Sequence, residues 1–178
     1  MFRRRRILNN MRTALGDAQL RTLQQANTLA ANGQPEQAAS LFAQLAVALE
    51  TSGHPRRAAN LHAQAAHAYA DSQDEAHALA ALRLFIRWQM AQRTPVFYTN
   101  ITRKMAAKGM AASVAVLQKE FGLAGPVPAA HAAAETARHG NLPAACSQCG
   151  GPLRSNEVAW VDDQTVGCIY CGAMVKTM

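Results

Sequence analysis

The four cysteines of the chain lie close together near its C-terminal end, as two Cys-x-x-Cys pairs. Cys146 and Cys149 form the first pair, Cys168 and Cys171 form the second, and eighteen residues separate the pairs. Thiolates at this spacing are typical ligands of a tetrahedral metal ion, because each pair occupies one tight turn and the two turns can face each other. A glycine follows each pair, and glycine readily adopts the positive φ that such turns often require. The pattern predicts one structural Zn²⁺ per chain, bound by all four cysteines.

Three other chemistries use similar cysteine pairs. A rubredoxin-like iron site has the same paired turns, but few aromatic residues surround these sulfurs. Thiol–disulfide exchange requires a thioredoxin-like strand and helix behind one pair, whereas this chain has two matching pairs. Catalytic zinc keeps an open coordination position, usually with histidine or carboxylate ligands, and four cysteines close the shell. The sequence therefore favours a structural zinc site, with iron as the less favoured alternative.

The remaining sequence contains no motif that predicts catalysis. A glycine-rich phosphate loop, a His-Glu-x-x-His pattern, a Gly-x-Ser-x-Gly pattern and a paired acidic motif are all absent. His62 and His67 are five residues apart on a predicted helix, about 140° apart around its axis, and so do not converge on one ligand. We therefore expect a protein that is not an enzyme.

The elements that must position the cysteines are short strands. In residues 146–178 the pattern changes to a period of two, which predicts strands at Glu157–Val161, Thr165–Cys168 and Ala173–Lys176. The segment resembles a zinc ribbon, and this resemblance implies that its four cysteines are the ligands. About thirty residues bury too little apolar surface to fold alone, whereas metal binding contributes about 10–16 kcal/mol in comparable zinc peptides. Trp160 is expected to pack on the hairpin, or alternatively to contact a partner.

Residues 8–122 are predicted to be helical throughout, since they are rich in alanine and interrupted by glycine and proline at regular intervals. A nine-residue pattern that begins at Gly33 recurs twenty residues later at Gly53. The short loops make successive helices antiparallel, and each hairpin can bury its apolar face only against the next. We expect a mainly α fold of about six helices in antiparallel hairpins, together with the small β ribbon.

The helical region also resembles the tetratricopeptide repeat family over about residues 13–122. The residues that carry the resemblance are Leu29, Gly33, Ala38 and Phe42, followed by Tyr69, Ala78 and Leu82. The chain departs from the family in its repeat spacing, about forty residues rather than about 34, and in lacking the repeat's tryptophan and terminal proline. A repeat solenoid is the favoured interpretation, and a plain six-helix bundle is the alternative.

The resemblance to the repeat family implies a protein or peptide partner. In that family the first helix of each hairpin lines the concave face of the array. The residues that this places near a partner are Asn27, Asn60, Gln64 and His67. The expected function is thus that of a protein–protein interaction or scaffold protein, and the sequence does not identify its partner.

The net charge of +7 is mostly a property of the N-terminus. Five of the 18 basic residues are Arg3, Arg4, Arg5, Arg6 and Arg12. The rest of the chain has 13 basic and 11 acidic residues, and so its net charge is only +2. The ribbon is acidic, which is the wrong sign for phosphate contacts. Nucleic-acid binding through the ribbon and the arginine tail is therefore the disfavoured alternative. The run Arg3–Arg6 could also make weak contacts with an anionic surface, or form a solvated tail.

We expect four parts along the chain: a basic tail at 1–7, a tetratricopeptide-like helical domain at 8–122, a linker at 123–145 and the zinc ribbon at 146–178. Prolines bound the linker. No apolar run approaches the roughly 18 residues of a membrane span. Cysteine occurs only in the metal motif, which fits a reducing compartment, and we expect a cytoplasmic protein.

Overall fold

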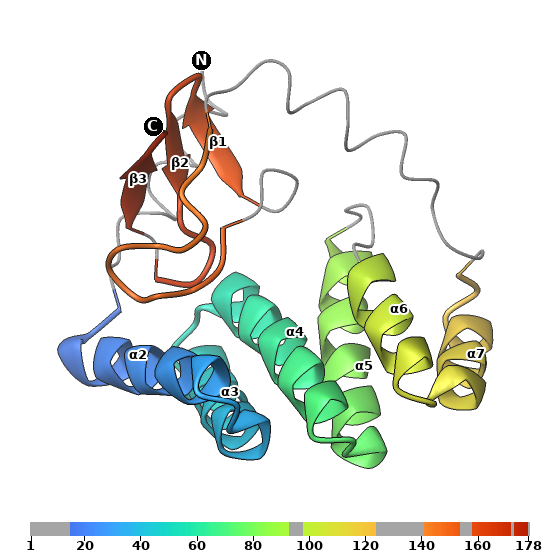
Figure 1. Cartoon of the computed structure of the whole chain (residues 1–178). Helices are drawn as coiled ribbons and strands as arrows, with labels where there is room; N and C mark the ends of the chain where they lie inside the picture. The colour runs from blue at the N-terminus through green and yellow to red at the C-terminus, as the bar shows by residue number, and fades with distance from the viewer. Residues whose placement is uncertain (1–14, 93–97, 124–140, 154–157, 172, 178) are drawn as a thin grey trace. The chain divides into compact units, whose positions relative to one another are not determined.

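The structure is a computed structural model that describes residues 15–92, 98–123, 141–153, 158–171 and 173–177 (Figure 1). These residues form six helices and three short strands, which confirms the mainly helical fold with a small C-terminal sheet. They divide into two compact units. One is Gln25–Val127, and the other combines Met1–Gln24 with Pro128–Met178.

The first four helices have similar lengths and intervals, and the last two are shorter. Their bounds are α2 Asp17–Ala31, α3 Pro35–Thr51, α4 Pro55–Asp71, α5 Glu75–Ala91, α6 Thr99–Ala107 and α7 Ala111–Glu120. Helices α3, α4 and α5 each have 17 residues and begin twenty residues apart. Proline opens α3 and α4, where its fixed φ suits the helix and its missing N–H needs no partner. Within the described residues, no helix is both long and apolar enough to cross a membrane.

Five of these helices end in a residue with positive φ. The residue is glycine in four cases, and Gln73 occupies the place in the turn after α4 with a φ of 62°. After α3, Gly53 has a φ of 81°, its N–H donates to the carbonyl of Glu50, and the N–H of His54 donates to the carbonyl of Leu49 at 2.8 Å. This is the Schellman motif, which satisfies the last carbonyls of a helix and turns the chain sharply.

The turn after α4 has neither glycine nor proline, yet it makes the same backbone bonds: the Gln73 N–H donates to the carbonyl of Ala70 and the Asp74 N–H to that of Tyr69 at 2.9 Å. Side chains add further contacts. Asp74 caps α5 by accepting a hydrogen bond from the His77 N–H at 3.2 Å. The His77 ring nitrogen Nδ1 lies 2.7 Å from Asp74 Oδ2, and the ring stacks on Tyr69 with centroids 5.1 Å apart. Burial first, and then the charges of Asp74 and Glu36, raise the pKa of Tyr69.

In the unit Gln25–Val127, helices pack against sequence neighbours, and two pairs of helices also contact across one intervening helix. Helix α4 packs between the antiparallel α3 and α5, and further contacts join α4 to α6 and α5 to α7. Asp71 and Lys104 pair near the C-terminal ends of α4 and α6, at 2.5 Å. Glu75 at the start of α5 bonds to Ser113 near the start of α7, and Arg83 in the middle of α5 pairs at 2.9 Å with Glu120 at the end of α7. The helices of the pairs α4–α6 and α5–α7 therefore run parallel.

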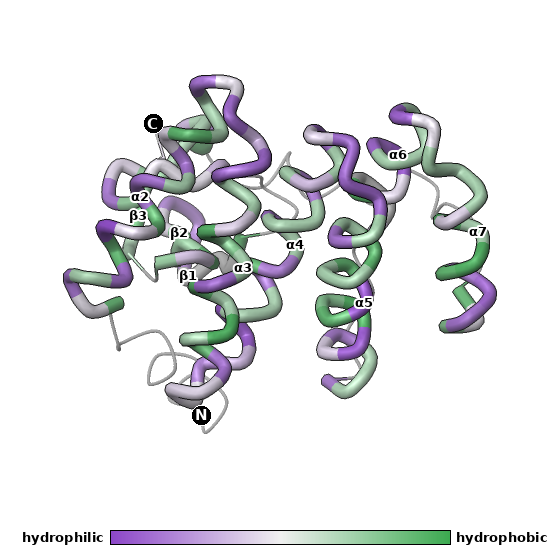
Figure 2. The backbone as a smooth tube through the Cα atoms, turned by 90° about the horizontal axis from the view of Figure 1, so that it is seen from below, coloured by the Kyte–Doolittle hydropathy of each residue, from purple (hydrophilic) through white to green (hydrophobic). Residues whose placement is uncertain are grey.

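The core of this unit is built largely from alanine. Figure 2 shows apolar and polar residues alternating along the helices. The residues with no exposed surface include Ala38, Ala39, Ala46, Ala58, Ala65, Ala66, Ala70 and Ala78, with Leu49, Leu61, Leu82 and Ile86 as larger side chains. Small side chains allow helix backbones to approach closely, and so the alanine-rich composition supports tight packing.

The burial of two helices differs from what residue type alone would give. In α5, Met90 is 45% exposed and Gln89 is buried. Leu82 and Ile86 lie on the buried face of α5, and Gln89 lies on the same face about one helical turn after Ile86. In α4, the charged residue Arg57 is buried where the helix packs against its neighbours.

Two helices begin within the described residues at positions that the sequence pattern did not mark. A helix was predicted from Leu8, but Leu15 and Gly16 are not helical and α2 begins at Asp17. Gly16 donates its N–H to Gln19 Oε1 at 3.3 Å, so that the side chain of Gln19 satisfies a backbone group at the helix start. A helix start at Thr94–Pro95 lies outside the described residues, and α6 begins at Thr99.

The ribbon is a three-stranded antiparallel sheet in the order β1-β2-β3, which confirms the three predicted strands. The strands are β1 Ala159–Asp162, β2 Thr165–Gly167 and β3 Met174–Lys176. Val166 of β2 lies opposite Val175 of β3, and both side chains are buried. In the β1–β2 turn, Asp162 Oδ1 accepts the N–H of Gln164 at 2.9 Å, and this bond lowers the pKa of Asp162.

Candidate metal centre

Two backbone turns of similar construction carry the cysteines. In the first, the Cys146 N–H donates to the Gly151 carbonyl at 2.8 Å, and the Gly150 N–H donates to the Cys146 carbonyl at 2.8 Å. In the second, the Cys168 N–H donates to the Ala173 carbonyl at 2.8 Å. Each turn is thus closed by a bond from its first cysteine to the carbonyl five residues later. Gly150 has a φ of 73°, which glycine adopts at little cost.

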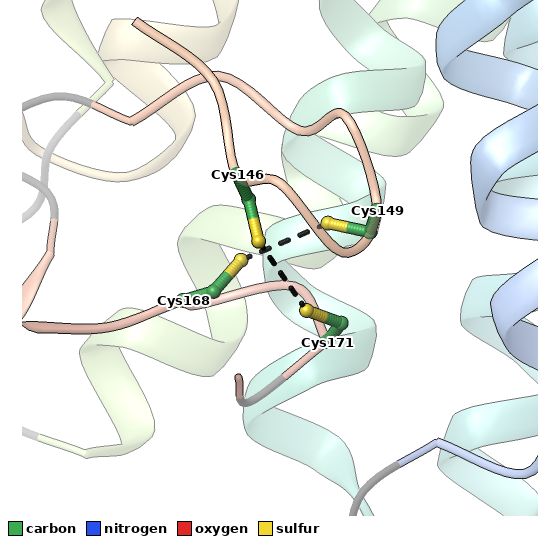
Figure 3. Close-up of side chains that lie close together, drawn as sticks. All are labelled: Cys146, Cys149, Cys168 and Cys171. Atoms are coloured by element: carbon green, nitrogen blue, oxygen red, sulfur yellow. Dashed lines mark hydrogen bonds between the residues drawn. The ribbon is translucent and has the colours of Figure 1, made fainter. Parts of the chain in front are cut away.

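The four cysteine side chains point toward one another (Figure 3). All four are buried, and their sulfur atoms lie within 4.8 Å of one another. The separations Cys146 Sγ–Cys171 Sγ and Cys149 Sγ–Cys168 Sγ are both 3.8 Å, and each joins one turn to the other. A tetrahedron of sulfurs about 2.3 Å from a central ion has edges of about 3.8 Å, whereas a disulfide requires about 2.05 Å. Four buried cysteines in this arrangement indicate a metal site.

The thiols also interact electrostatically. Hydrogen bonding from Cys149, followed by Cys168 and Cys171, lowers the pKa of the Cys146 thiol, and the bonds to Cys146 raise the pKa of Cys149 and Cys168. The Gly151 N–H donates to Cys149 Sγ at 3.4 Å, a contact that favours a thiolate there. A bound cation would replace the shared protons, since metal ligands must be deprotonated.

Tyr170 is a second residue that shapes the centre. Its side chain is 1% exposed, and it packs directly on the backbone of Gly151. A Cβ atom at position 151 would lie 2.6 Å from Tyr170 Cδ2 and 3.3 Å from Cys149 Sγ. Only glycine fits there without displacing the ring. The sequence reasoning gave Tyr170 no role, and the doubled glycine after Cys149 is the signal that could have revealed this contact.

The residues predicted to bind a partner lie mostly in the helical unit. Asn27 is on α2, and Asn60, Gln64 and His67 are on α4, all of them half-buried. The three on α4 are spaced four and three residues apart and therefore share one face of the helix. Trp160 is in β1, but its side chain lies outside the described residues, as does the run Arg3–Arg6. The partner-binding role of all these residues stays a prediction.

Comparisons with protein-family models, with curated proteins and with solved structures found no match to this chain. The observations that bear on its function are therefore the cysteine cluster and the packing of the helices.

Proposed function

We propose that the protein is a non-enzymatic interaction protein, in which a helical-hairpin array offers a surface to a protein or peptide and a zinc ribbon forms a second folded module. The observation that carries this proposal is the regular packing of the array. Helices α3, α4 and α5 have equal lengths and recur at twenty residues; α4 packs against both α3 and α5, and further contacts join α4 to α6 and α5 to α7. In such arrays the contacts are between neighbours, which leaves an extended surface for recognition.

The metal of the ribbon is Zn²⁺, in a structural role. Four thiolates at tetrahedral separations are a soft ligand set that suits zinc, and no coordination position remains for a substrate. The ion stabilises a segment with a small apolar core, in which Val166, Tyr170 and Val175 are buried beside the cysteines. Metal analysis of the purified protein should find one zinc per chain. Iron, with its visible absorption, or metal-free protein with four freely titratable thiols would refute the assignment.

The face of α4 that carries Asn60, Gln64 and His67 is the proposed contact surface. Amide side chains both donate and accept hydrogen bonds, and so they can pair with the backbone of an extended peptide. All three are half-buried. This reduces the side-chain entropy that a partner's binding must overcome.

An affinity pull-down from the native host tests the proposal with the full-length protein. The variant Asn60→Ala/Gln64→Ala/His67→Ala should lose a partner that the unchanged protein retains. A matched control, Gln37→Ala/Gln44→Ala/Arg87→Ala, alters three exposed positions on α3 and α5 and should retain it. Equal loss from both variants, or no specific partner for the unchanged protein, would count against the proposal.

The described ribbon does not favour the nucleic-acid alternative. Asp162 and Asp163 are both exposed at the β1–β2 turn, where they present negative charge to solvent. Phosphate backbones are bound by basic side chains, with a steep dependence on salt. Salt-dependent binding of DNA or RNA by the full-length protein would overturn this preference.

A further inference from the structure

The first half of α2 belongs to the same compact unit as the ribbon. That unit consists of Met1–Gln24 and Pro128–Met178, and Gln24 is the last residue of its N-terminal part. Gln24 Nε2 donates to the backbone carbonyl of Gln148 at 2.7 Å, although the two residues are 124 positions apart. Gln148 lies inside the first ligand turn, between Cys146 and Cys149. A helix side chain is therefore bonded directly to a metal-binding turn.

The bonded carbonyl is next to a ligand in the covalent structure. The C=O of Gln148 and the N–H of Cys149 belong to one planar peptide group. A hydrogen bond that holds this carbonyl therefore also sets the orientation of the backbone from which the Cys149 side chain departs. Gln148 itself is exposed, so its own side chain contributes little packing to hold the turn. The bond from Gln24 supplies that constraint from outside the turn.

The helix in turn depends on its surroundings. The segment Asp17–Gln24 is the first half of α2, and the whole helix has 15 residues, close to the roughly twelve to fifteen below which an isolated helix is only marginally stable in water. Leu23 is 1% exposed and Leu15 is 7% exposed, so packing holds this end of α2 in place. We therefore expect the helical order of Asp17–Gln24 to depend on the folding of the unit that surrounds it.

We propose that Gln24 is a positioning residue of the metal centre, which links metal occupancy to the order of Asp17–Gln24. The proposal rests on the metal binding proposed above. Gln24 holds the first ligand turn in the geometry that binds the ion, and the bound ion holds the turn that accepts the hydrogen bond of Gln24. Such linkage is reciprocal. Loss of the donor weakens metal retention, and loss of the metal loosens the start of α2.

The first test uses isosteric variants of the full-length protein. Gln24→Glu keeps the shape of the side chain but replaces its N–H donor by a carboxylate oxygen that faces the Gln148 carbonyl. Gln25→Glu makes the same change of charge at the next residue of α2, which is also exposed. Gln24→Lys restores a donor at position 24. The three variants separate the hydrogen bond from charge and from the presence of a substitution in the helix.

The measurement is the rate of zinc transfer to a chromogenic chelator. Gln24→Glu should release zinc about three- to tenfold faster than the unchanged protein and Gln25→Glu, while Gln24→Lys should lie closer to the unchanged protein. The Co²⁺-loaded Gln24→Glu variant should also show altered visible absorption, which reports the geometry of the thiolate shell. Equal rates and spectra for Gln24→Glu and Gln25→Glu would overturn the role of Gln24.

The second test measures amide hydrogen exchange with and without a chelator. Exchange in Asp17–Gln24 should speed up when the metal is removed, whereas α4 in the other unit should exchange as before and serves as the internal control. Unchanged protection of Asp17–Gln24 would overturn the linkage. If the unchanged protein binds no metal, the zinc assignment fails instead; if it binds zinc and Gln24→Glu behaves normally, only the present inference fails.

Discussion

Replacing Gln73 with glycine should stabilise the helical unit. Among the described residues other than glycine, Gln73 is the one with a positive φ, which is 62°. It lies twenty residues after Gly53 and forty after Gly33, and both of these glycines also have a positive φ. A side chain in this left-handed conformation brings Cβ close to the carbonyl that follows and costs about 1–2 kcal/mol. Glycine has no Cβ and escapes this cost.

The expected gain is smaller than the full strain energy. Glycine also gives the unfolded chain more freedom, which lowers the free energy of unfolding by about 0.4–1 kcal/mol. The side chain of Gln73 is exposed, so little packing is lost with it. The net effect is an increase in the free energy of unfolding of about 0.5–1 kcal/mol. For a unit of about one hundred residues this raises the melting temperature by about 2–6 °C.

Thermal and urea unfolding of the full-length protein, followed by far-ultraviolet circular dichroism, would measure this change. Gln73→Ala is the matched control, because it removes the side chain but keeps Cβ and should not stabilise. Gly53→Ala is the reciprocal test. The φ there is 81° and nothing lies within 4 Å of an added Cβ, so a loss of stability reflects backbone strain, reduced by the lower freedom of alanine in the unfolded chain, and not a steric clash. No stabilisation by Gln73→Gly, together with a neutral Gly53→Ala, would refute the reasoning.

Three further predictions concern the metal centre and the buried tyrosines. Gly151→Ala should speed zinc release at least several-fold, because its Cβ would collide with Tyr170, as measured by transfer to a chelator. Cys168→Ser should abolish stoichiometric zinc, as measured by metal analysis, because it removes one of four thiolates. Burial raises the pKa of Tyr69 and Tyr98, so the folded protein holds these protons more tightly than the unfolded chain. The resulting contribution to the free energy of unfolding is present below pH 10.0 and is lost as the pH rises further. Urea unfolding near pH 9 and near pH 11 would measure this loss.

Each of these predictions has an outcome that contradicts it. A Gly151→Ala variant with unchanged zinc release would show that the ring of Tyr170 moves aside freely. Full zinc content in Cys168→Ser would mean that this cysteine is not a ligand. The tyrosine interpretation requires that Tyr69→Phe and Tyr98→Phe reduce the loss of stability at high pH, and it fails if they leave the pH dependence unchanged.

Much of the fold follows from local sequence patterns. Proline at the start of α3 and α4, and glycine just after α2 and α3, marked the helix boundaries, because these residues act on the backbone where they stand. The four cysteines were recognised from their spacing alone. The alternation in residues 159–176 indicated the three strands.

Other features could not be predicted because they depend on packing between distant parts of the chain. Gln73 takes the place of a glycine, and the contact between Tyr69 and His77 supports its turn. Arg57 is buried because α4 has helices on several sides. The ring of Tyr170 meets Gly151 only after the two ligand turns have come together.

By itself, the sequence determined the twenty-residue period of the helices and the identity of the four metal-ligand candidates, since both depend on residues close in the chain. The tertiary structure alone decided that α4 and α6, and α5 and α7, run parallel in contact, that the four sulfurs converge within 4.8 Å of one another, and that Gln24 bonds to the first ligand turn across 124 residues. Contacts of this kind form when chain segments far apart in sequence are brought together by packing. No local pattern encodes which distant carbonyl a side chain such as Gln24 will meet.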